Sequence, residues 1–368
     1  MRRLLIVLCL IVLIVAAVGV GLLAADWPFW QRAWAWQTAA AGRPPALPGA
    51  RRMLAGTPAV PPPAASAPAP LTATAIAALT SLARQQPTAA LLVAQRGALL
   101  FESYGPSIDA ASLLDGADLS SAWLAPLFGI ASANRPGLLD EPVGDYLPEW
   151  RGDPRGQITP RQLFWHVSGL AVPDFVPLNP FSDRARLASG PNFVRAALAF
   201  PAELPPGGFF RHSPADMQLL ALVLQRATGS DVADYLEAGL WIPLGAGPAQ
   251  VLLDRRGGTI AAHCCFAAAA RDWLRLAQLL ADGGVAGGRR LLPEEFVTQI
   301  ARQSPVHPGA GLGLTVEAGP GGSQLLVMQG EGRWLIAAPE RGVAVMWFSS
   351  TSALSQEARH AVLTALGL

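Results

Sequence analysis

The chain has 368 residues, 51% of them apolar, which is enough to bury the core of one large domain or two small ones. Its 27 basic and 26 acidic residues give a net charge of +1, so we expect no nucleic-acid-binding surface. All of the basic residues are arginine, which excludes any mechanism that needs a lysine amine.

An uncharged apolar run from Leu4 to Ala25 follows two arginines. At about 1.5 Å per residue, a helix of this length crosses a bilayer. The arginines predict a cytoplasmic N-terminus, and the tryptophans that follow the run are typical of a membrane interface. A cleaved signal peptide is the alternative, although its apolar region is usually about 7–15 residues long. We therefore predict that residues 1–37 form an uncleaved anchor in the cytoplasmic (inner) membrane, with the remaining chain on the periplasmic side.

Residues 38–71 are rich in alanine and proline and include Pro61-Pro62-Pro63. This composition is typical of an extended, semi-rigid segment. We interpret it as a linker that holds the folded domain away from the membrane, and we expect that domain to cover residues 72–368.

The predicted domain begins with a helix over residues 74–85. Two strands follow, over residues 89–95 and 98–104, joined by the turn Arg96-Gly97. Strands at both ends of the domain and helices between them predict an α+β fold. Further helices are predicted over residues 120–133, 192–200, 213–228, 268–282 and 352–366, and further strands over 313–317, 324–329, 333–338 and 343–348.

The predicted helix over residues 120–133 is the centre of this arrangement, because its apolar residues recur at helical spacing and should be buried. Asp118 or Ser120 is expected to cap its first turn. Pro126 argues against a straight helix, since proline removes one backbone hydrogen bond.

Cysteine usage does not indicate a disulfide framework, because Cys264 and Cys265 are neighbours. We interpret them as two small buried residues on a strand. His263 stands beside them, but side chains of consecutive strand residues point to alternate faces, which argues against a metal site. No cofactor is predicted.

Several segments carry a resemblance to a known superfamily. In chain order they read GIA (129–131), LLDEPVGDYLPEW (138–150), ITPRQLFWHVSGL (158–170) and DVADYLEAGLWIPLG (231–245). They resemble the serine β-lactamases and penicillin-binding proteins, in particular the class C β-lactamase-related esterases and 6-aminohexanoate-dimer hydrolases. The resemblance implies a β-lactamase/transpeptidase-like α+β domain, in which an antiparallel sheet is flanked by helices and carries a helical insertion. It also implies the pocket of a serine hydrolase.

The same resemblance implies three catalytic motifs, and none of them is intact. Counted back from Gly129, the serine of Ser-x-x-Lys falls on Asp118 and the lysine on Ser121. In the stretch PGGFFRHSP (206–214), His212 takes the place of the tyrosine of Tyr-x-Asn. Residues 325–329 supply neither Lys-Thr-Gly nor His-x-Gly. The usual acyl-transfer reaction of these enzymes is therefore not expected.

Two interpretations of these residues remain open. In one, Asp118, Ser120 and Ser121 cap the central helix, and His212 fills the space of the tyrosine. In the other, Ser121 and His212 lie within hydrogen-bond reach, and with Asp118 nearby they form a rebuilt catalytic pair. His166 matches a histidine that is usually structural in the enzymes this chain resembles.

Three functions follow as hypotheses. The first is a catalytically degenerate homologue that binds an unknown small molecule or envelope partner outside the cytoplasmic membrane. The second is an active amide or ester hydrolase that uses Ser121 and His212. The third is a purely structural envelope protein.

Overall fold

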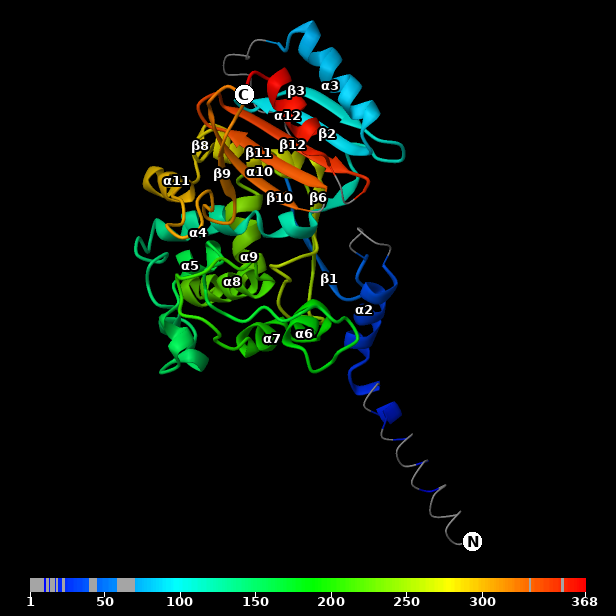
Figure 1. The fold of residues 1–368 in the computed structure, drawn as a ribbon, viewed down its shortest axis with the longest axis vertical. Helices are drawn as coiled ribbons and strands as arrows, with labels where there is room; N and C mark the ends of the chain where they lie inside the picture. Colours follow the sequence, from blue (N-terminus) through cyan, green and yellow to red (C-terminus); the bar gives the residue numbers. More distant parts are fainter. Residues whose placement is uncertain are drawn as a thin grey trace.

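A six-stranded antiparallel sheet forms one half of the domain in this computed structural model (Figure 1). The structure describes residues 10, 13, 17, 19–21, 24–39, 45–57, 70–330, 332–351 and 354–368. The strands lie in the order β3-β2-β12-β11-β10-β9. Their bounds are β2 Thr88–Gln95, β3 Ala98–Tyr104, β9 Thr315–Ala318, β10 Gln324–Gly330, β11 Arg333–Ala338 and β12 Val343–Ser349.

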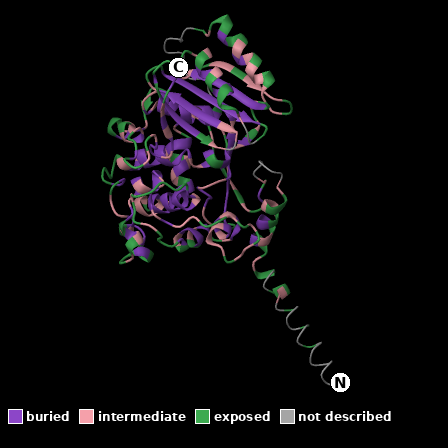
Figure 2. Ribbon diagram, viewed as in Figure 1, coloured by how far each residue is buried: buried purple, intermediate pink, exposed green. Residues whose placement is uncertain are grey.

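Helices cover both faces of this sheet, and the alternation of side chains in β2 explains why. Leu91 and Val93 pack with residues of α3 (Ala73–Gln85) and α12 (Gln356–Ala365). Leu92 and Ala94 point the other way, into the larger core that includes α10 (Ala270–Ala281). Figure 2 shows the central strands as buried, which is the pattern of a sheet covered on both sides.

The predicted helical insertion forms the other half of the domain (Figure 1). Its largest helix, α8, is buried over ten of its residues, and Trp150 and Trp241 fill the space between the surrounding elements. The insertion consists of α4 Leu124–Ser132, η2 Val143–Asp145, η3 Pro148–Trp150, η4 Pro154–Gln157, α5 Pro160–Phe164, α6 Asp183–Ser189, α7 Phe193–Ala199, α8 Pro214–Thr228, α9 Val232–Leu236 and η5 Glu237–Trp241. A small hairpin, β7 (Val285–Ala286) with β8 (Arg289–Arg290), and helix α11 (Glu294–Ile300) lie beyond α10.

A second sheet, in the order β1-β5-β6-β4, was not predicted. Its strands are β1 Arg51–Leu54, β4 Leu113–Asp115, β5 Ala249–Leu252 and β6 Phe266–Ala269. Strand β1 pairs antiparallel with β5, with Arg51 opposite Leu252. The prediction of an extended linker over residues 38–71 is therefore wrong for β1, because its backbone groups are hydrogen-bonded to the domain. Residues 40–44 and 58–69 lie outside the described part of the chain.

Helix α2 (Trp27–Thr38) also packs on the domain. Phe29 and Ala33 are buried against Ala185 of α6. Most of the predicted membrane-spanning run, residues 4–25, lies outside the described residues. Among the residues that the structure does describe, no helix combines the length and the apolar composition needed to cross a membrane.

The central helix begins later than predicted. A 3₁₀ helix, η1 (Ala117–Ser121), contains Asp118 and Ser120, and α4 starts only at Leu124 without a side-chain cap. The predicted capping roles are therefore wrong; the Ser120 hydroxyl instead accepts a hydrogen bond from the backbone N–H of Phe266 at 3.1 Å. Pro126 falls in the first turn of α4, where a missing N–H breaks no intrahelical bond.

The two neighbouring cysteines differ from the prediction as well. A disulfide joins Cys264 to Cys265, and the pair precedes β6 instead of lying within a strand. Cys265 has a φ of 66°, so the backbone turns here before it enters β6.

Candidate functional site

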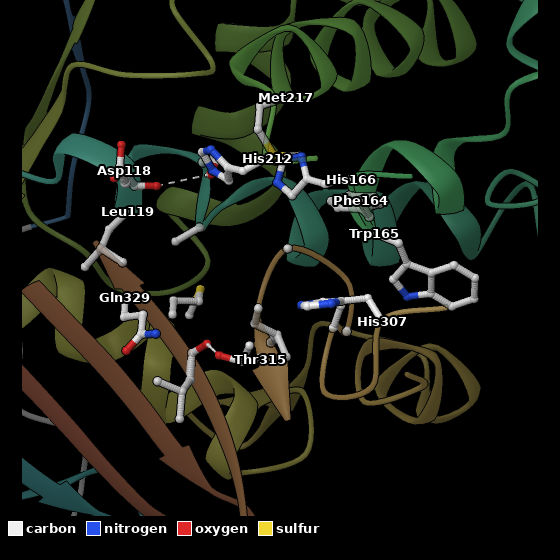
Figure 3. A pocket seen from close by; sticks show the side chains of 18 of the residues that line it. Asp118, Leu119, Phe164, Trp165, His166, His212, Met217, His307, Thr315 and Gln329 are labelled. Carbon is white, nitrogen blue, oxygen red and sulfur yellow. Dashed lines mark hydrogen bonds between the residues drawn. The ribbon is translucent and has the colours of Figure 1, made fainter. Parts of the chain in front are cut away.

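A pocket with a volume of about 240 Å³ lies where η1 and the end of β10 face α5 and the start of α8 (Figure 3). Apolar and aromatic side chains form much of its wall, and three histidines are among its polar groups. The described residues that line it are Asp118, Leu119, Ser121, Ala122, Phe164, Trp165, His166, Phe210, His212, Met217, His307, Ala310, Gly311, Gly313, Leu314, Thr315, Val327, Met328 and Gln329.

All three candidate residues from the sequence, Asp118, Ser121 and His212, line this pocket. The Ser121 hydroxyl donates to the backbone carbonyl of Asp118 over a long distance of 3.5 Å. Within the described chain, no hydrogen bond joins Ser121 to His212. The structure thus brings the two residues into one pocket, while the Ser121 hydroxyl is directed elsewhere.

Asp118 stands where η1 meets the end of β10. A Cβ atom added to Gly330 would lie only 2.4 Å from the Cβ of Asp118, so this approach requires glycine in β10. Burial raises the pKa of the Asp118 carboxyl, and the positive charge of Arg333 opposes that rise. A partly desolvated carboxyl group therefore occupies the position that the resemblance assigns to the nucleophile.

A second carboxyl group approaches the pocket from behind His166. Nδ1 of His166 lies 3.1 Å from Oδ2 of Asp216 in the first turn of α8, and 3.3 Å from the backbone N–H of Ser213. Asp216 is fully buried, and this burial raises its pKa while His166 opposes the rise. His166 itself has a φ of 54°, a backbone conformation that is uncommon for residues other than glycine.

Reasoning from the sequence missed the pair of His166 and Asp216. The two residues are 50 positions apart, and an aspartate in the first turn of a helix is ordinarily explained by the helix dipole. The one available signal was the histidine in the motif at residues 158–170, which we interpreted as structural.

The His212 ring lies beside the His166 ring, with 4.6 Å between the ring centroids. Burial of the His212 ring, together with the charges of His166 and Arg184, lowers its pKa to about 4. The imidazole is therefore neutral at pH 7 and can accept a proton. Because the residue keeps exposed surface, solvent reduces the energetic consequence of this shift.

The third histidine of the pocket, His307, stacks on Phe210 with 3.9 Å between the ring centroids and 15° between their planes. Three histidines thus line one cavity. Even so, among the described residues no group of three His, Cys, Asp or Glu side chains is arranged to hold a metal ion.

The described residues that line the pocket include an acidic side chain but no strongly basic one. Among the described lining residues, Asp118 is the one carboxylic acid, and none is an arginine. The lining therefore provides aromatic surface and hydrogen-bonding groups, but no fixed positive charge to pair with an anionic ligand.

Comparison with known proteins places this chain in a family. The β-lactamase family model matches residues 73–367. The chain is similar to monacolin J acid methylbutanoyltransferase of Aspergillus terreus, with 30% identity over 141 residues, which is 33% of this chain and 34% of the transferase. It is also similar to 6-aminohexanoate-dimer hydrolase of Paenarthrobacter ureafaciens, with 31% identity over 94 residues, 25% of this chain and 24% of the hydrolase.

A penicillin-binding protein homolog from Caulobacter crescentus shares the fold at 17% sequence identity. The superposition covers 82% of this chain and 99% of that chain, with a TM-score of 0.65. It confirms the predicted β-lactamase/transpeptidase-like α+β architecture. Because the family model covers nearly all of the folded domain, this chain belongs to the β-lactamase-related serine hydrolase family.

Proposed function

We propose that the protein is an exported, membrane-attached member of this family whose pocket binds a small molecule without the family's acyl-transfer chemistry. The observation that supports the proposal is Asp118, a carboxylic acid that lines the pocket and stands at the position that the resemblance assigns to the serine nucleophile. A carboxylate cannot replace a serine hydroxyl in the acyl-enzyme scheme, and the chain has no lysine to activate a hydroxyl. The pocket is present, with a volume of about 240 Å³, although the serine and the lysine of the family motif are missing.

The charge of the lining limits the class of ligand. A carboxylate-bearing molecule would lose its hydration without gaining a cationic partner among the described lining residues, which is costly. A neutral or amine-bearing molecule with an apolar part fits better, because Asp118 can accept from an amine while Phe164, Trp165 and Phe210 offer aromatic surface. A cavity of about 240 Å³ limits the buried part to a small group.

Acylation by a mechanism-based probe tests the loss of chemistry. The full-length protein, treated with a penicillin or a fluorophosphonate and analysed by intact mass, should show no adduct, and it should not hydrolyse nitrocefin. The double variant Asp118→Ser/Ser121→Lys, which restores the family spacing of serine and lysine, is the control for probe access. An adduct on any residue from 118 to 121 of the wild type would contradict the proposal.

Ligand class is tested with three probes of similar size: benzylamine, benzyl alcohol and benzoate. We expect chemical-shift changes or thermal stabilisation with the first two and none with benzoate. The variant Asp118→Asn should lose the preference for the amine over the alcohol. Benzoate binding as tightly as benzylamine would refute the assigned ligand class.

One observation favours the alternative function of an amide or ester hydrolase. The lowered pKa of His212 leaves a neutral imidazole in the same pocket as the Ser121 hydroxyl. A rotation of the Ser121 side chain away from the Asp118 carbonyl would be needed before the two could act together.

A further inference from the structure

Helix α2 has one buried face and one aromatic exposed face. Phe29, Arg32 and Ala33 are buried against the domain. Trp27 and Trp34, seven residues apart and so on one side of the helix, are 56% and 62% exposed. Trp27 and Trp34 therefore point away from the part of the domain that the helix covers.

The buried face is fixed by Arg32, whose side chain is almost completely inaccessible to solvent. Its guanidinium group donates four hydrogen bonds of 2.9–3.1 Å to backbone carbonyls of three separate segments, at Pro48, Gly190, Leu253 and Asp254. A buried guanidinium group is stabilised by these hydrogen bonds, and moving α2 would leave its charge without partners in the interior. Helix α2 is thus held in one orientation relative to the domain.

The segment that leads into α6 lies against α2 and is itself apolar on its outside. Arg186 of α6 forms an ion pair with Asp26 and lies over the ring of Phe29. The rings of Trp36 and Phe175 pack edge to face at 5.3 Å. Beyond this contact, Val176, Leu178 and Phe181 are 52%, 37% and 93% exposed. Helices α2 and α6 lie at the end of the domain opposite the large sheet and α3 (Figure 1).

We propose that these exposed side chains form a membrane-docking face, defined by Trp27, Trp34, Val176, Leu178 and Phe181, that rests on the lipid bilayer. Helix α2 begins two residues after the apolar run ends at Ala25, and α2 itself packs on the domain. A run embedded in the bilayer would therefore hold the domain close to the membrane surface. Tryptophan and phenylalanine side chains are favoured at the membrane interface. The inference rests on the membrane attachment proposed above. It adds that the domain has a fixed orientation relative to the bilayer, instead of hanging from a flexible linker.

The test uses the full-length protein in lipid vesicles. A nitroxide label is attached to the variant Phe181→Cys in a Cys9→Ser background. The Cys9→Ser protein without the cysteine at position 181 is treated with the same reagent and shows whether Cys264 or Cys265 reacts. The matched control is Ile76→Cys on α3, which is 42% exposed and lies at the opposite end of the domain. Collision rates with oxygen, which concentrates in lipid, and with a water-soluble nickel chelate are then measured at both sites.

We expect the oxygen-to-nickel ratio at position 181 to exceed that at position 76 severalfold. Equal ratios at both sites in protein that floats with the vesicles would overturn the docking face and leave the membrane attachment standing. Failure of the wild type to float with vesicles would overturn both. A label at position 181 that becomes accessible to nickel only when Arg32→Leu is added would further support the orienting role of Arg32.

Discussion

A Cβ atom on Gly330 would approach the Cβ of Asp118 to 2.4 Å and its Oδ2 to 2.8 Å, so η1 and β10 meet at a separation that glycine alone allows. The variant Gly330→Ala should therefore push η1 out of place and lower the free energy of unfolding by about 1–3 kcal/mol. Ligand binding in the pocket should weaken as well. Denaturant titration measures the first effect and probe titration the second.

The control for this change is Gly239→Ala, because a Cβ there would meet Leu127 at an ordinary distance of 3.7 Å. This variant should lose no stability, since alanine is favoured over glycine in a helical segment. Equal stability of the two variants would show that the contact between η1 and β10 is looser than the structure indicates.

Arg32 provides the second prediction. Replacing it with leucine leaves three buried carbonyl groups and one partly buried carbonyl group without their donor, and each buried unsatisfied group costs about 1–3 kcal/mol. We expect Arg32→Leu to lose more than about 3 kcal/mol of stability and to expose α2 to proteases. The matched change Arg52→Leu removes partly exposed ion pairs with Asp231 and Asp234 and should cost at most about 1 kcal/mol. Similar losses of stability in both variants would show that the buried hydrogen bonds of Arg32 contribute no more than the exposed ion pairs of Arg52.

Phe128 tests the placement of α4. Its ring is fully buried and packs edge to face on Phe164, with 5.1 Å between the ring centroids. Phe128→Ala should lower the free energy of unfolding by about 3–5 kcal/mol, the range for a large buried aromatic side chain. Phe209→Ala, at a ring that is 62% exposed, should change it by no more than about 0.5 kcal/mol. A loss below about 1 kcal/mol at Phe128 would mean that α4 does not bury this face.

His263 gives a prediction about pH. Burial, with a contribution from the charge of Arg32, lowers its pKa to about 4 from the usual value of 6.5. Between these two pH values the unfolded chain binds more protons at this site than the folded chain, so stability falls as the pH falls from about 6.5 to 4. The loss from this residue is at most about 3 kcal/mol. The variant His263→Phe should lack this part of the pH dependence, whereas the exposed His360→Gln should keep it. Identical pH slopes for all three proteins would contradict the buried, neutral state of His263.

The hydrolase alternative also predicts a specific pH profile. A protonated imidazole cannot accept the serine proton, so an active pair would gain activity as the pH rises through about 4, the lowered pKa of His212. We expect no hydrolysis of short-chain esters and amides by the wild type at any pH. Activity that rises near pH 4 and disappears in both Ser121→Ala and His212→Ala would instead establish the alternative, and the double variant should then lose little more.

The sequence predicted those parts of the fold whose signals are local. The strands and helices around the large sheet follow from alternating and helical apolar patterns, and the turn Arg96-Gly97 indicates the hairpin of β2 and β3 directly. Three residues of the pocket wall followed from the resemblance, because Asp118, Ser121 and His212 were located by their distance from recognisable segments.

What the sequence could not predict depends on contacts between distant segments. Asp216 reaches His166 across 50 residues, and Arg32 binds carbonyls up to 222 residues away. Neither contact leaves a periodic or compositional signal. Strand β1 was missed for a related reason: an alanine- and proline-rich context conceals a four-residue strand whose partner, β5, lies nearly 200 residues further on.

The pairing of β1 with β5 means that the family boundary and the folding unit do not coincide. The family match begins at residue 73, downstream of both α2 and β1. A chain shortened to that boundary would leave one edge of β5 with unpaired backbone N–H and C=O groups, and would uncover the cavity that the Arg32 side chain now fills. An exposed strand edge recruits strands from other molecules, so such a fragment is prone to swap segments or aggregate. Work on the isolated domain should therefore retain the chain from Asp26 onward, where the ion pair with Arg186 begins the contact.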